Sequence, residues 1–145
     1  MKKLLFFTFT IILFAGADLL AQSSIFGKWK TIDDESGEAK SVVEIYEEDD
    51  KAFGKVTKIF RKDKQDAICD ECDEDDPRKD QKILGMVILK NMEKEGDEWT
   101  NGKILDPNSG SVYKCTMWVE DGKLHVRGYI GFSLIGRTQV WERVE

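Results

Sequence analysis

Alternation of apolar and polar side chains is the main pattern of the chain after its first twenty or so residues. In the segment 123–130 every second residue is apolar or small, which is typical of a strand with one buried face. These residues are Leu124, Val126, Gly128 and Ile130. The segment 111–119 alternates in the same way, with Tyr113, Cys115, Met117 and Val119 on one face. Because the period is two and no stretch shows the 3.6-residue period of a helix, the pattern predicts β-structure.

The same pattern predicts about eight strands. They lie near 26–32, 41–46, 52–60, 83–90, 98–105, 111–119, 123–130 and 138–144. Most of the links between them are short and carry the turn formers Asp, Asn, Gly and Pro, as in DDESGEA, EEDDK, EKEGD, DPNSG and EDG. Short links join antiparallel neighbours, so we expect an up-and-down meander. Closure would remove its free edges, and we therefore predict an all-β, lipocalin-like (calycin-type) barrel.

One connection, 61–82, is much longer than the others. Loops of more than about 12–15 residues without structure of their own are uncommon in compact domains and often serve as lids or binding elements. The sequence is equally compatible with a disordered flap.

The first 21 residues have the order of a secretory signal peptide: Lys2 and Lys3, an apolar run from Leu4 to Phe14, then small residues. The apolar run is too short to span a bilayer comfortably. Cleavage after Ala17 fits the Ala-Gly-Ala pattern, and cleavage after Ala21 is the site that we favour. The mature chain, 22–145, would then be a single β-barrel domain of about 124 residues, exported to the periplasm or the extracellular space.

Charge excludes some classes of partner. The net charge of the whole chain is −6 and becomes −7 without Lys2, Lys3 and Asp18. The basic residues are interleaved with acidic ones, as in EKEGDEW and RKDKQD. An acidic domain of this kind has no electrostatic reason to bind nucleic acid or an anionic membrane surface. We also expect no stable membrane span after the signal peptide is removed.

Three motifs follow one another along the chain: FGKW at 26–29, GKILDPNSGSVYKC at 102–115 and VRGYIGFSLIGRTQVW at 126–141. Together they resemble the exported bacterial family called domain of unknown function 2147, over nearly the whole mature chain. The resemblance implies a calycin-like barrel with lipocalin-type topology and no established activity. The Gly-X-Trp opening is similar to the start of lipocalins, which implies that Trp29 packs under Arg137 or Arg143 as a stopper at one barrel end.

The motif Cys69-Asp70-Glu71-Cys72 has three interpretations. The surrounding carboxylates oppose thiolate formation and so argue against redox catalysis. A metal site would need further ligands, and only Cys115 and His125 remain as Cys or His. A structural disulfide suits an exported protein, and we favour Cys69 with Cys72, although either could instead pair with Cys115. We therefore predict no metal and no cofactor.

Catalytic motifs are weak. His125 is the only histidine, and GFSLIG lacks the spacing of a serine nucleophile elbow. Asp106 and Gly110 have an adequate explanation as turn residues. Enzyme activity, which we do not favour, would require Asp106, Tyr113 and two arginines, Arg127 and Arg137, to meet in one cleft.

Two functional hypotheses remain. The leading one is a binding protein that holds a small apolar or amphipathic ligand in a barrel cavity of several hundred Å³. The alternative is a protein-protein interaction or envelope-structural module with a packed interior and an exposed apolar patch. The residues that we single out as ligand-binding candidates match the family motifs. They are Trp29, Asp106, Tyr113, Arg127, Arg137, Gln139 and Trp141.

Overall fold

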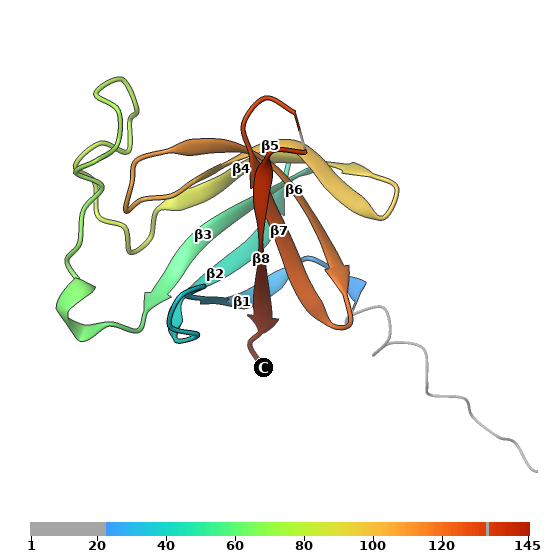
Figure 1. Ribbon diagram of the computed structural model, residues 1–145, viewed down its shortest axis with the longest axis horizontal. Helices are drawn as coiled ribbons and strands as arrows, with labels where there is room; N and C mark the ends of the chain where they lie inside the picture. Colours follow the sequence, from blue (N-terminus) through green and yellow to red (C-terminus); the bar gives the residue numbers. More distant parts are fainter. Residues whose placement is uncertain (1–22, 133) are drawn as a thin grey trace, which may run out of the picture.

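Eight antiparallel strands form a closed barrel in the order β1 to β8 (Figure 1). The computed structural model describes residues 23–132 and 134–145, so the predicted signal peptide 1–21 lies outside the described residues. The strands are β1 (Gly27–Ile32), β2 (Ala39–Glu48), β3 (Lys51–Ile59), β4 (Val87–Glu95), β5 (Glu98–Leu105), β6 (Val112–Glu120), β7 (Lys123–Tyr129) and β8 (Gly136–Arg143). The prediction of an all-β, closed up-and-down barrel is confirmed.

The seam between β1 and β8 closes the barrel. Trp29 pairs with Arg143, and Lys30 pairs with Glu142. An ion pair of 2.9 Å joins the Lys30 Nζ to a Glu142 carboxylate oxygen on the outer face. These pairs join the two ends of the meander and close the barrel, which protects the strand edges where they meet.

The fourth strand starts later than the sequence predicts. We expected it over 83–90, but β4 runs from Val87 to Glu95. A turn occupies the first part of the expected strand: the Met86 amide donates to the Ile83 carbonyl at 3.0 Å, and Gly85 has a φ of 90°. The polar residues at the end of β4 belong to the strand because their backbone pairs with that of β5. This pairing does not require apolar side chains.

Apolar side chains fill the barrel. The largest that are fully buried on the strands are Trp29, Val43, Ile45, Leu89, Met92, Leu105, Cys115, Met117, Leu124 and Trp141. At Gly54 a Cβ atom would lie 2.9 Å from the Leu89 Cβ, so the missing side chain leaves room for its neighbours. Burial of each large apolar side chain contributes about 1.5–3 kcal/mol, and this core stabilises the closed form.

The long connection from β3 to β4, residues 60–86, has structure of its own and projects from one side of the barrel (Figure 1). It contains a short 3-10 helix (η1, Lys62–Lys64) and a β-bridge between Ile68 and Lys82. The Cys69 amide donates to the Gln81 carbonyl at 2.9 Å. This segment, called the connector below, is therefore an ordered element. In residues 23–132 and 134–145 there is no helix long and apolar enough to cross a membrane.

Candidate functional site

Four connections lie at one end of the barrel, because alternate links of a meander meet there. They are 33–38, the connector, 106–111 and 130–135. We call this the loop end. The other end carries the short turns between β2 and β3, β4 and β5, and β6 and β7.

A polar network at the loop end joins three of the predicted site residues. The Trp141 indole Nε1 donates to the Gln139 side-chain oxygen at 3.1 Å, and the Gln139 amide nitrogen donates to an Asp34 carboxylate oxygen at 3.3 Å. Arg137 forms an ion pair with the same Asp34 oxygen at 3.0 Å. The network thus connects the loop 33–38, which follows β1, to β8.

Asp34 was missed by the sequence analysis. It lies in the acidic run DDESGE, where nothing distinguishes it from its neighbours. Only the pairing of β1 with β8 places it opposite Arg137.

The other candidates at the loop end take part in turns and strand pairs. Asp106 accepts the Asn108 amide at 3.0 Å, and Gly110 has a φ of 72°, as the turn interpretation of these residues predicts. The Arg127 guanidinium donates to the Thr138 hydroxyl on the neighbouring strand at 3.2 Å. Tyr113 lies on β6 opposite Ile104. The interactions found for these residues are those of turns and strand pairs.

Trp29 lies at the opposite end of the barrel. It is fully buried and donates its indole N–H to the Ile25 carbonyl at 2.7 Å. Of the two arginines that the lipocalin resemblance left open, Arg143 is the one that stacks on it, with its guanidinium carbon 4.0 Å from the ring centroid. The packing of Trp29 against an arginine, which the lipocalin resemblance implied, is therefore found with Arg143.

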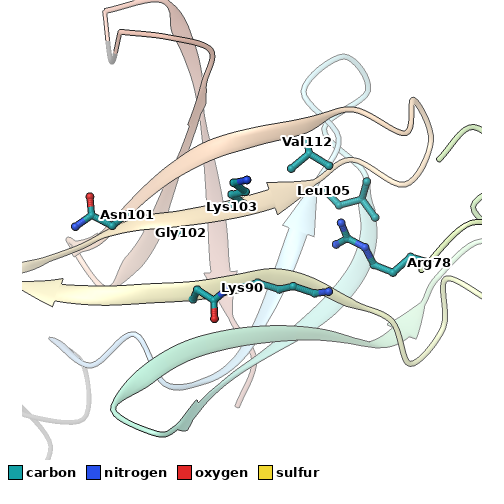
Figure 2. Close-up of a pocket in the computed structure, with 8 residues that line it drawn as sticks. Arg78, Lys90, Asn101, Gly102, Lys103, Leu105 and Val112 are labelled. Atoms are coloured by element: carbon teal, nitrogen blue, oxygen red, sulfur yellow. The ribbon is translucent and has the colours of Figure 1, made fainter. Parts of the chain in front are cut away.

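The expected cavity inside the barrel is not found among the described residues. Two hollows of the described chain open to its surface; the buried Leu105 on β5 lines the smaller one and the buried Met86 of the connector lines the larger one. The smaller, of about 170 Å³, lies on the outer wall over β4 and β5 (Figure 2). The larger, of about 540 Å³, lies between the connector and the start of β4. The Trp118 ring stacks on the His125 ring on the outer face, with the ring centroids 5.3 Å apart.

The β7–β8 connection exposes a cluster of apolar side chains. Ile130, Phe132, Leu134 and Ile135 are 67%, 80%, 90% and 70% exposed. Our expectation that Ile130 shares the buried face of Leu124 is wrong, because β7 ends at Tyr129 and the chain turns. The Ile130 amide donates to the Ile135 carbonyl at 3.3 Å, which closes the turn. We call these four residues the apolar tip.

The cysteines of the connector form a disulfide between Cys69 and Cys72. Cys115 is a free thiol in the barrel core, and burial raises its pKa to about 12. The disulfide packs against the 106–111 turn: the backbone of Gly110 approaches the Glu71 carbonyl closely. No three His, Cys, Asp or Glu side chains converge to hold a metal ion anywhere in the part of the chain that the structure describes.

The connector is also anchored to β4 by a pair of charged residues. Arg78 donates to both Asp76 carboxylate oxygens, at 2.9 and 2.7 Å, and to the Val87 carbonyl at 3.2 Å. Both side chains are only 15% exposed. The Arg78 guanidinium lowers the pKa of Asp76 to about 2.

Comparison with known proteins places this geometry in a family. The family described as "Uncharacterized protein conserved in bacteria (DUF2147)" matches residues 27–143. A solved structure is titled "Protein HP1028 from the human pathogen Helicobacter pylori belongs to the lipocalin family", and it is similar to 85% of this chain over 84% of its own, with a TM-score of 0.66 and 19% identity. At this identity the likeness shows the fold alone, a lipocalin-like barrel. No curated protein matches the chain.

Proposed function

The chain belongs to the DUF2147 family of uncharacterized proteins conserved in bacteria, and we propose that it is a noncatalytic interaction module that binds another protein through the apolar tip. The observation that supports this proposal is the exposure of the tip. Four large apolar side chains within six residues are 67–90% exposed. The other exposed large apolar side chains of the described residues reach 41% at most. Clusters of this kind mark interaction sites.

The surroundings of the tip favour a protein partner. The barrel beneath it is filled by its own side chains, which leaves the apolar residues of the tip without an internal partner. At the base of the tip, Arg137 is already paired with Asp34. An apolar centre with a polar rim is the usual composition of a protein interface, whereas surface segments that bind membranes commonly carry Lys and Arg on their polar face.

Site-specific crosslinking tests this proposal. A photo-crosslinking amino acid at position 132, in the full-length protein in the envelope of its own host, should give one discrete protein adduct. The same amino acid at Asp50, an exposed residue at the opposite end of the barrel, is the matched control and should give none. The purified partner should then bind the wild-type protein, and Phe132→Ser with Leu134→Ser should weaken that binding at least tenfold without lowering Tm. Binding of the partner by this double variant with the affinity of the wild type would contradict the proposal.

A second candidate function is the binding of a small apolar or amphipathic ligand, which the lipocalin-like fold supports. Native mass spectrometry of protein purified from its host's envelope separates the two. A small molecule bound at one copy per chain, and lost in Phe132→Ser with Leu134→Ser, would favour the ligand over the protein partner. Bare protein of the expected mass favours the interaction module.

Export to the periplasm or the extracellular space is also a proposal, which rests on the sequence of residues 1–21. N-terminal sequencing of the protein from its host should give Gln22 as the first residue. A mature protein that retains Met1 would contradict it.

A further inference from the structure

The hollow on the outer wall gathers positive charge on a chain whose net charge is −6. It has a volume of about 170 Å³ and lies where the connector meets β4, β5 and β6. Its lining includes Arg78, Lys90 and Lys103, together with the apolar side chains of Leu105 and Val112. Figure 2 shows Lys90 extending along the sheet toward Arg78. No carboxylate residue lines the hollow.

Two of these cations belong to a row of lysines across three strands. Lys90 on β4 is directly opposite Lys103 on β5, and Lys103 is directly opposite Lys114 on β6. Their strand neighbours Leu89 and Ile104 pack in the core, so the lysines point outward. None of the three forms an ion pair with a carboxylate of the described chain. Like charges directly opposite each other destabilise a sheet, and a bound anion would remove that cost.

Arg78 is held in place at the edge of this row. Its two hydrogen bonds to Asp76 and its bond to the Val87 carbonyl fix the guanidinium beside β4. The Asp76 carboxylate interacts with Lys90 as well as with Arg78, so Arg78, Lys90 and Lys103 together with this one carboxylate leave an excess of two positive charges. The Arg78–Asp76 pair forms a fixed side of the hollow.

The backbone under the hollow has an uncommon form. Asn91 and Asn101 have φ values of 58° and 60°, in the left-handed region, and Asn101 donates to Glu93 at 3.3 Å. A Cβ atom at Gly102 would lie 2.5 Å from the Lys90 carbonyl oxygen, so only glycine permits this approach of the two strands. Sparsely populated backbone conformations cluster at functional sites.

We propose that this hollow binds a phosphate monoester group. The excess of two positive charges matches the charge of a phosphate monoester, which is about −1.5 to −2 at pH 7, whereas a carboxylate would leave one positive charge without a partner. The larger hollow shares Arg78 and Lys90 with this one and continues past Leu84, Met86 and Val87. It accommodates the organic substituent of the phosphate. The site shares no residue with the apolar tip and does not depend on the function proposed for it.

Isothermal titration with inorganic phosphate tests the site directly. The wild-type protein should bind one phosphate per chain, more tightly at pH 7.5 than at pH 5.5 because the second pKa of phosphate is near 6. Lys90→Gln with Lys103→Gln should weaken binding at least tenfold. The matched control is Lys94→Gln with Lys123→Gln, two exposed lysines outside the hollow, and it should change the affinity less than twofold.

Two further measurements complete the test. In the absence of phosphate, Lys90→Gln with Lys103→Gln should raise Tm by about 1–3 °C, since it removes the like-charge contact. Glycerol 3-phosphate and phosphatidylcholine vesicles that contain phosphatidate distinguish a soluble source from a lipid source, and dependence on Lys90 and Lys103 in either arm supports the site. Equal losses in the control and the test variant, or no phosphate binding by the wild type, would overturn it.

Discussion

Arg143 and Trp29 are partners in the pairing of β8 with β1, and they also stack, with the Arg143 guanidinium carbon 4.0 Å from the centroid of the Trp29 ring. The same guanidinium donates to the Ser24 carbonyl at 2.6 Å and to the Phe26 carbonyl at 3.2 Å. Burial lowers the pKa of Arg143, although an arginine stays charged at any ordinary pH. One side chain thus joins the strand that closes the barrel to the segment that precedes its first strand.

Replacement of this arginine should destabilise the barrel. We expect Arg143→Met to lower the free energy of unfolding by about 2–4 kcal/mol, because it removes a buried cation-π contact and leaves two carbonyl groups without a donor. Urea denaturation followed by tryptophan fluorescence measures the change. Arg61→Met is the control: the ion pair of Arg61 with Asp63 is well exposed, and its loss should leave the urea midpoint close to that of the wild type. Equal urea midpoints for the two variants would show that the contact between Arg143 and Trp29 contributes little to the stability of the barrel.

Gly110 and Gly37 offer a matched pair for testing the contact between the disulfide and the 106–111 turn. Both have a φ of 72°, but a Cβ atom at Gly110 would collide with the Glu71 backbone, whereas at Gly37 nothing lies within 4 Å. We expect Gly37→Ala to cost about 1 kcal/mol from its backbone conformation alone. Gly110→Ala should cost at least about 2 kcal/mol more, as a steric clash adds to the same strain. If chemical denaturation gives the two variants the same stability, the connector does not pack on this turn.

Asp76 should make stability depend on pH in the acid range. Arg78 lowers the pKa of this carboxyl from its ordinary 3.8 to about 2, so the folded state favours the ionised form. The resulting stabilisation, about 1–2 kcal/mol, is complete above pH 4 and is lost as the pH falls through about 2. Asp76→Asn should therefore be less stable than the wild type at pH 7 and equally stable near pH 2. Urea midpoints at pH 7, 4, 3 and 2 measure this convergence, and a difference that persists unchanged at pH 2 would contradict it.

Thiol labelling should distinguish the three cysteines. Cys115 is fully buried and burial raises its pKa to about 12, so the native protein should not react with iodoacetamide at pH 8. Unfolded without reductant, the chain should gain one adduct by mass spectrometry; unfolded with reductant, it should gain three. Cys115→Ala serves as the control and should gain none without reductant. Two or three adducts without reductant would mean that Cys69 and Cys72 are not joined.

The strand pattern could be predicted because it depends on local alternation. Seven of the eight expected strands lie within two or three residues of the observed bounds, and the period of two also identified Leu124, Val126, Cys115 and Met117 as buried. The fourth strand was displaced because Ile83 to Met86 are apolar yet form a turn under the connector. Burial by a loop produces the same hydrophobic signal as burial in a strand.

The candidate site was predicted only in part. The family motifs selected Arg137, Gln139 and Trp141, which do form one network, and they also selected Trp29, which lies at the other end of the barrel. Asp34 and Lys103 were not found, because one lies within an acidic run and the other is a single lysine on a strand. Their significance depends on which residues stand opposite them.

The sequence by itself determined the class of fold, the number of strands and the choice of glycine and aspartate at the turns, because backbone sterics and the alternation of burial act between residues close in the chain. Only the tertiary structure decided that the barrel interior is filled, that Arg143 covers Trp29, and that Lys90, Lys103 and Lys114 stand in one row. The physical reason is the register. A shift of one residue between two strands exchanges every opposing pair, and that register is set by the packing of the whole barrel.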